Sequence, residues 1–278
     1  MLKLTLILSI LAIFIASLPN PKNTVYPPSN AQSWKNAPFS ATSSAQDIYS
    51  KIYGVAETHS LTKYRSVVKD PFGGDDYVIK VVYEKGGYAS KGPGGQAMYA
   101  RPPIAYSKAK TIKFCYDIAF DANFDFGAPT KIGNIGIGEG KTPGLFSGDT
   151  TNCEVPSKCF SMRYMWRADG VGEIFPTVVS KADRPPGWCP DEKKCGNGSG
   201  GQGDSIGRGS FSFKRGQWQT LCQIISATSK GTMEVQYNGK TVISKSGIKY
   251  GVNFAKGGFI FATFFGGNQD NASSKTQA

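Results

Sequence analysis

The chain has 278 residues, 40% of them hydrophobic, and a formal net charge of +12. It contains one histidine, so the excess is permanent Lys and Arg charge that changes little near neutral pH. Such a charge favours a polyanionic partner, and the absence of a nucleic-acid motif argues against nucleic acid and for acidic polysaccharide. A role in solubility alone is the open alternative.

We expect the N-terminal 60 residues to precede the folded domain. Residues 1–17, MLKLTLILSILAIFIAS, are typical of a secretory signal peptide: a lone Lys3, a short apolar run, then small residues. An uncleaved anchor is the alternative. Residues 18–60, rich in Pro, Ser and Asn, form a linker or N-terminal arm with one predicted short helix at 44–54. Residues 61–278 form one domain, and we expect a secreted, extracellular protein without membrane contact after signal cleavage.

Alternation of apolar and polar residues predicts strands along most of the domain. The predicted strands are residues 76–84, 111–120, 160–166, 217–225, 232–243 and 258–265. Asn238-Gly239 is a strong signal for a two-residue hairpin. The stretch GNIGIGEG at 133–140 superficially resembles a dinucleotide-binding fingerprint. That fingerprint leads into a helix, and this stretch does not, so we interpret it as a glycine-rich loop. Many short strands joined by Gly-rich turns predict an all-β sandwich or jelly roll.

Six cysteines behind a signal peptide favour three disulfides. Two pairs bracket short stretches and could close small loops, while the remaining two lie in predicted strands and would join them. The favoured pairing is Cys115 with Cys222, Cys153 with Cys159, and Cys189 with Cys195. Other connectivities remain open. Because the chain has neither a CxxC pair nor a histidine cluster, we expect no metal and no cofactor.

The stretch CFSMRYMWRADGVGEIFPTVV at 159–179 holds the candidate site residues. Alternate residues of a strand share a face. One face carries Ser161, Arg163, Met165 and Arg167, and the other carries Met162, Tyr164 and Trp166. The chain then turns back, which would set Arg163 opposite Phe175 or Thr177 on the polar face.

Arginine suits a site for acidic sugars because its planar guanidinium binds a carboxylate through two parallel hydrogen bonds. The alternative for Arg163 and Arg167 is a surface ion pair with Asp169 or Glu173.

Two other kinds of catalytic site are less favoured. His59 is not accompanied in the sequence by the Ser and Asp residues of a catalytic site, and we expect it to be an ordinary surface residue rather than a catalytic base. The carboxylates of Asp117, Asp121 and Asp125 fit solvated loop and strand-end positions as well as a glycosidase pair. A hydrolase is therefore the weaker enzymatic hypothesis.

Five blocks spread over roughly residues 75–268 share their order and spacing with one known family. They are SKGPGGQAMYARPP, KIGNIGIGEGKTPGLFSG, CFSMRYMWRADGVGEI, SIGRGSFSFKRGQW and FATFFGGN. Together they resemble polysaccharide lyase family 14, which includes alginate lyases of marine molluscs and glucuronate-cleaving lyases of algal viruses. The resemblance implies a β-jelly-roll sandwich with a basic groove on its concave sheet. It also implies β-elimination on a polyuronate such as alginate, polymannuronate or glucuronan, and we expect a monomer.

The resemblance also assigns roles to single residues. Lys131, Ser161 and Arg163 match the catalytic positions of the family, and Arg167 and Asn268 are assigned to substrate binding. Asn268 stands where the family has a histidine. The two cations would neutralise the uronate carboxylate and stabilise the developing dianion, while a base and an acid move the protons.

The sequence departs from the family at the proton-transfer positions. The family has two catalytic tyrosines there, and this chain has Phe175 and Thr177. An active lyase would then use Lys131 or a tyrosine from another strand, such as Tyr237 or Tyr250. A non-catalytic, lectin-like binder of acidic polysaccharide that has lost the tyrosines is the alternative, and a matrix protein without a specific groove is a third possibility.

Overall fold

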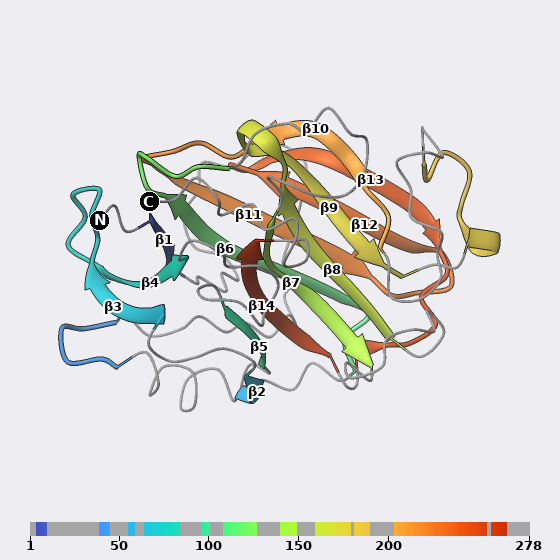
Figure 1. Ribbon diagram of the computed structural model, residues 1–278. Coiled ribbons are helices and arrows are strands. Elements are labelled where there is room, and N and C mark those ends of the chain that lie inside the picture. The colour runs from blue at the N-terminus through green and yellow to red at the C-terminus, as the bar shows by residue number, and fades with distance from the viewer. Residues whose placement is uncertain are drawn as a thin grey trace.

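The computed structural model describes residues 4–9, 39–44, 55–58, 64–83, 96–100, 108–126, 140–148, 159–178, 181–189, 203–254 and 257–265. Within them the chain forms two seven-stranded sheets (Figure 1). Sheet A has the order β13 (Lys240–Ile248), β12 (Gly231–Tyr237), β11 (Trp218–Ser226), β6 (Thr111–Phe120), β1 (Leu4–Ser9), β4 (Tyr77–Tyr83) and β3 (Arg65–Lys69). Sheet B has the order β10 (Ile206–Ser212), β9 (Val171–Thr177), β8 (Cys159–Trp166), β7 (Gly140–Gly148), β14 (Gly258–Phe265), β5 (Gln96–Ala100) and β2 (Val55–Thr58).

Neighbouring strands in both sheets are antiparallel. The described ranges also include the 3₁₀ turns Ala168–Gly170 and Lys181–Asp183. The all-β prediction is confirmed. In this part of the chain, no helix has the length and apolar character needed to cross a membrane.

The six predicted strands are confirmed as β4, β6, β8, β11, the β12–β13 pair and β14. The hairpin between β12 and β13 turns at Asn238 and Gly239, which have φ angles of 48° and 79°. Two consecutive residues with positive φ are the requirement of a tight hairpin turn, which explains the Asn-Gly pair. The predicted helix at 44–54 lies outside the described residues, except for Ser44.

Two long strands were missed from the sequence because glycine and proline interrupt their alternation. β7 contains Pro143 and Gly144, and β10 contains Gly207 and Gly209. Both strands also change register against their neighbours, so they do not keep the period of two on which the predictions depend.

β1 comes from the segment predicted to be a signal peptide. It pairs with β4 through Leu4–Leu8 and with β6 through Leu6–Ser9, and so lies between these two strands in sheet A (Figure 1). The cleavage of this segment stays a prediction. If it occurs, sheet A loses the strand that joins β4 to β6.

The two sheets pack face to face around an aromatic core. Trp166 of sheet B packs edge-on against Tyr83 and Phe120 of sheet A, with ring centroids 6.3 and 5.5 Å apart. Phe114 and Phe259 stack across the sheets at 5.4 Å. Since full burial of a large apolar side chain contributes about 1.5–3 kcal/mol, these aromatic layers hold the two sheets together.

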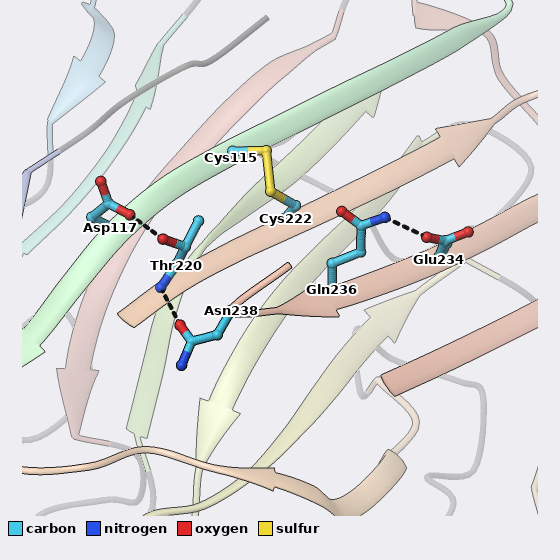
Figure 2. The surroundings of a disulfide bond; sticks show 7 residues. All are labelled: Cys115, Asp117, Thr220, Cys222, Glu234, Gln236 and Asn238. Carbon is cyan, nitrogen blue, oxygen red and sulfur yellow. Dashed lines mark hydrogen bonds between the residues drawn. A yellow bond between two sulfur atoms is a disulfide. The ribbon is translucent and has the colours of Figure 1, made fainter. Parts of the chain in front are cut away.

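The outward-facing side of sheet A carries the predicted Cys115–Cys222 disulfide, which is confirmed (Figure 2). The two cysteines lie opposite each other on β6 and β11, although 107 residues separate them in sequence. Cys159 and Cys189 are also disulfide-bonded. The pairing predicted for them involves Cys153 and Cys195, which lie outside the described residues.

Candidate active site

β8 has the two faces that its sequence predicts. Phe160, Met162, Tyr164 and Trp166 are at most 1% exposed and belong to the core. Ser161 and Arg163 are partly exposed on the opposite side, where they pair with Thr177 and Phe175 of β9. Of the two residues predicted to lie opposite Arg163, Phe175 is the one that the structure shows, and Thr177 lies opposite Ser161. We call the outward-facing side of strands β7–β10 the outer face of sheet B. Its residues are Lys141, Phe146, Ser161, Arg163, Met165, Glu173, Phe175, Thr177 and Arg208.

Arg163 is a cation without a counter-ion on this face. It has neither a hydrogen bond nor an ion pair in the described part of the chain, and its Nε is fully buried. Burial lowers the pKa of Arg163, and Tyr99 of β5 partly offsets this effect. A desolvated guanidinium is costly unless an anion pairs with it. The ion-pair alternative therefore does not hold for Arg163, and the geometry favours an anionic ligand.

Lys141 of β7 lies beside Arg163. It is opposite Met165 in the register, and its Nζ is 5.6 Å from the centroid of the Phe175 ring. Burial, and then the neighbouring Arg163 cation, hold the pKa of Lys141 well below its usual value. A lysine whose pKa is lowered in this way is neutral at a lower pH than usual and can then serve as a general base.

Sequence reasoning missed Lys141. It assigned the catalytic lysine to Lys131, which lies outside the described residues and stays a prediction. The stretch GKTPGLFSG reads as a loop because of Pro143 and Gly144. The sequence feature that could have pointed to Lys141 is that it is the one charged residue in β7.

A break in the β7 ladder sets the backbone beside Arg163. The register of β7 against β8 shifts between Thr142 and Gly144, and Gly144 then faces Arg163. A Cβ on Gly144 would lie 1.7 Å from the carbonyl oxygen of Met162, so no other residue fits. Gln223 of β11 reaches this point from sheet A. Its Oε1 accepts from the Leu145 N–H at 3.0 Å, and its Nε2 donates to the Met162 carbonyl at 2.7 Å.

Tyr116 of β6 braces the same break. Its hydroxyl lies 2.7 Å from Thr142 Oγ1 and donates to the Pro143 carbonyl at 3.0 Å. Burial raises the pKa of Tyr116 well above its usual value, so the hydroxyl stays protonated and remains a donor. The Tyr116 and Gln223 side chains thus provide hydrogen-bond partners for backbone groups of β7 that a regular β-ladder would have paired with a neighbouring strand.

Glu173 is fully buried and accepts four hydrogen bonds from three side chains. Arg167 donates to its Oε1 from Nε at 2.9 Å and from Nη2, while Arg208 Nε and Ser205 Oγ each donate to Oε2 at 2.6 Å. For Arg167 the structure thus shows the ion pair that the sequence left open. This pairing leaves its predicted role in substrate binding untested, but it commits one edge of its guanidinium to Glu173.

Phe175 and Thr177 occupy the positions of the family's tyrosines. Thr177 is 9% exposed opposite Ser161, and Phe175 lies opposite Arg163 with its ring near Lys141. Neither position offers a phenol.

The proposed substitutes, Tyr237 and Tyr250, do not lie on this face. The Tyr237 hydroxyl donates to Gln219 and to the Ser212 carbonyl, and the Tyr250 hydroxyl donates to the Thr232 carbonyl. Burial raises the pKa of both tyrosines. The idea that either one acts as the base is wrong. Asn268 lies outside the described residues.

Comparison with known proteins agrees with this fold. The polysaccharide lyase 14 family model matches residues 73–278. The marine PL-14 alginate lyase from Aplysia kurodai is similar, with 24% identity and a TM-score of 0.65, over 87% of this chain and 93% of that one. The alginate lyase vAL-1 from Chlorella virus has 21% identity and a TM-score of 0.61, over 84% and 93%.

A more distant similarity is to the alginate lyase Aly36B, with 18% identity and a TM-score of 0.53, over 84% of each chain. No curated protein sequence matches this chain. The two nearer structures and this chain share an antiparallel β-sandwich of the jelly-roll type. The family model covers most of the chain, and the chain therefore belongs to the polysaccharide lyase 14 family.

Proposed function

We propose that this protein cleaves an acidic polyuronate by β-elimination on the outer face of sheet B. The observation that carries the proposal is Arg163, a partly buried cation without a counter-ion among the described residues, beside Lys141, whose pKa is lowered. Family membership supplies the reaction class. The similar structures are alginate lyases, which supports an alginate-like substrate, and a variant of one of them, Aly36B, is in complex with an alginate trisaccharide.

In the first step, Arg163 binds the carboxylate of the sugar residue to be cleaved. Neutralising this charge makes the hydrogen on the adjacent carbon, C5, more acidic, and the guanidinium then stabilises the dianion that forms. Ser161 lies next to Arg163 on the same face and can donate its hydroxyl to the sugar. Both groups come from β8, so their spacing is fixed by the strand.

In the second step, Lys141 transfers the proton. The neutral Nζ takes the proton from C5, the electrons of the C–H bond form a double bond between C4 and C5, and the C4–O bond breaks. The ammonium of Lys141 then returns the proton to the departing glycosidic oxygen. One group performs both transfers, which fits a face where Phe175 and Thr177 provide no phenol. The products are an unsaturated uronate and a new sugar hydroxyl.

The second candidate is a non-catalytic binder of acidic polysaccharide. Phe175 and Thr177 favour it, because the loss of a general acid or base typically costs about 10²–10⁴-fold in rate. Such a protein needs Arg163 for binding but has no use for a lysine with a lowered pKa. Lys141 is therefore the residue that separates the two candidates.

The test is to incubate the purified protein with alginate, polymannuronate and glucuronan and follow the ultraviolet absorbance of the unsaturated product. We expect product with at least one polymer and none from a neutral glucan. Lys141→Ala should lose activity and keep binding, whereas Lys131→Ala shows whether the lysine assigned by resemblance is needed as well. Binding without product at any pH from mildly acidic to strongly alkaline would support the binder.

Export is also part of the proposal, and it is supported by residues 1–17 and by the disulfides. We also propose that the exported protein is a monomer. Mass spectrometry of the protein exported by its host should find an N-terminus close to residue 18. Light scattering should give the mass of one chain.

A further inference from the structure

Arg208 lies in a bulge of β10 that turns its side chain over sheet B. β10 pairs with β9 at Ile206, opposite Ile174, and again at Phe211, opposite Gly172. The stretch of β10 between these two pairs is longer than the matching stretch of β9, so the extra residues bulge out.

The backbone on both sides of Arg208 requires glycine. Gly207 and Gly209 have φ angles of 66° and 85°, a region that side chains disfavour. A Cβ on Gly207 would also lie 2.4 Å from Ile243. The two glycines therefore allow the backbone to form this bulge, from which Arg208 reaches Glu173.

Only one edge of the Arg208 guanidinium is used. Nε donates to Glu173 Oε2 at 2.6 Å and to Ser205 Oγ at 3.2 Å. The side chain nevertheless stays 39% exposed. Neither terminal nitrogen has a hydrogen-bond partner in the described ranges. Arg208 is thus held in place by Nε, while the two Nη groups remain available for a ligand.

Glu173 is shared between two arginines. Its one carboxylate pairs with both Arg167 and Arg208. Glu173 is also the only acidic residue within strands β7–β10. Since an exposed, positioned guanidinium binds a carboxylate through two parallel hydrogen bonds, the chemistry of this corner fits a second carboxylate.

This corner lies close to the reaction site. Arg163 is opposite Phe175, and Glu173 is the next outward-facing residue along β9, about 7 Å away at the rise of a strand. β10 lies two strands from β8, about 10 Å away at the usual strand spacing. A single oligosaccharide that places one carboxylate on Arg163 can therefore reach Arg208 with another.

We propose that Arg208 binds the carboxylate of a uronate residue other than the one that loses its proton. Arg208 is then a substrate-binding residue, and Glu173 and Ser205 are the positioning residues that aim it. The inference rests on the proposed function of the same face. It predicts that Arg208 contributes to the affinity for charged oligosaccharides of sufficient length and does not contribute to the chemical step.

The test compares Arg208→Gln with Lys230→Gln, which removes the same charge from an exposed turn between β11 and β12. Binding of size-defined oligouronates is measured by calorimetry in Lys141→Met protein, where the ligand is not cleaved. We expect Arg208→Gln to weaken the binding of longer oligomers about tenfold or more and Lys230→Gln less than about twofold. On otherwise unchanged protein, Arg208→Gln should raise KM and leave kcat unchanged.

Arg208→Lys keeps a cation beside Glu173 and serves as a control for a folding defect. Its affinity for the longer oligomers should lie between those of the wild type and Arg208→Gln. Equal effects of Arg208→Gln and Lys230→Gln, or a fall in kcat alone, would overturn the inference. If the inference about Arg208 fails in this way but Arg163→Gln still abolishes binding, the proposed function of this face stands without the role of Arg208. If the Lys141→Met protein with Arg163 and Arg208 intact binds no oligouronate, both fail together.

Discussion

The outward-facing sides of the two sheets each carry a partly buried lysine, and the two lysines have opposite neighbours. Burial lowers the pKa of Lys113 on sheet A, and the carboxylate of Glu234 offsets this effect. Burial also lowers the pKa of Lys141 on sheet B, and the cation of Arg163 adds to it. One lysine has its counter-ion within the protein, whereas the other lies beside a second cation.

The remaining polar groups follow the same division. On sheet A, Asp117 accepts from Thr220, which in turn donates its N–H to Asn238 (Figure 2), and Glu234 accepts from Gln236 and from Thr241. On sheet B, Glu173 is the only acid in strands β7–β10. The difference favours the proposal that an anionic ligand binds the outer face of sheet B rather than the outward-facing side of sheet A.

The largest expected effect is on catalysis. Lys141→Ala should lower kcat about 10²–10⁴-fold, because it removes the group that moves the proton. Lys113→Ala, the matched lysine on sheet A, should change kcat less than about twofold. The measurement is the initial rate of absorbance increase on the preferred polyuronate, and similar losses in both variants would remove the distinction between the two faces.

The disulfide of sheet A should contribute to stability alone. Closing a loop of about 100 residues contributes about 4–5 kcal/mol in the chain-entropy model, and typical measured values are about 2–4 kcal/mol. Replacing Cys115 and Cys222 together by serine should therefore lower the free energy of unfolding in urea by a similar amount. KM per folded molecule should stay the same. A changed KM would indicate that the outward-facing side of sheet A takes part in substrate binding.

Two buried glutamines of β11 offer a matched test of how the site is positioned. Gln223 is 0% exposed and holds the β7–β8 backbone beside Arg163, whereas Gln219 is 1% exposed and holds the Lys214 backbone in a turn. Each glutamine-to-methionine variant should cost about 1–3 kcal/mol of stability.

Only Gln223→Met should also lower kcat, by about tenfold, and change the pH profile of activity, because the backbone beside Arg163 shifts relative to Lys141. Gln223→Glu keeps the acceptor and should recover part of the rate. If both methionine variants have the wild-type pH profile, Gln223 serves the fold alone.

Restoring a phenol should increase the rate. Thr177→Tyr, alone or with Phe175→Tyr, places a second proton-transfer group opposite β8, and we expect kcat to rise about tenfold. Ser212→Tyr, on β10, serves as the control for an added tyrosine. An unchanged rate in a folded Thr177→Tyr protein would mean that Lys141 already suffices for both proton transfers.

The smallest effect is the pH dependence of stability. The pKa of Lys141 is lower in the folded protein than in the unfolded chain, so the unfolded chain binds more protons between these two values. Stability should rise with pH from the lowered pKa up to about 10.4, the usual lysine value, by about 1.4 kcal/mol for each unit of difference. Urea unfolding of wild type and Lys141→Met across this range measures the effect, which should be absent in the variant.

The fold was largely predictable because β6 and β8 alternate between two kinds of face, while β11 and β14 are short runs rich in β-branched and aromatic residues. The alternation of β8 placed Ser161 and Arg163 on one face and limited the residue opposite Arg163 to Phe175 or Thr177, of which the structure shows Phe175. These are local properties of two strands joined by a short turn, so they can be predicted from the sequence of that segment alone.

The rest of the site depends on contacts that the sequence does not contain. Lys141 matters because a bulge at Pro143 and Gly144 brings it beside Arg163, and that bulge depends on side chains from the other sheet. The choice between a free Arg163 and a paired Arg167 likewise depended on where the single carboxylate of Glu173 points. Neither could be read from spacing along the chain.

The most direct measurement is a crystal structure of the Lys141→Met protein with a bound uronate oligosaccharide. We expect one sugar carboxylate within hydrogen-bond distance of Arg163, with the C5 hydrogen of that sugar facing the side chain at position 141. An oligosaccharide on the outward-facing side of sheet A, or one whose carboxylates avoid Arg163, would contradict the assignment of the site to sheet B.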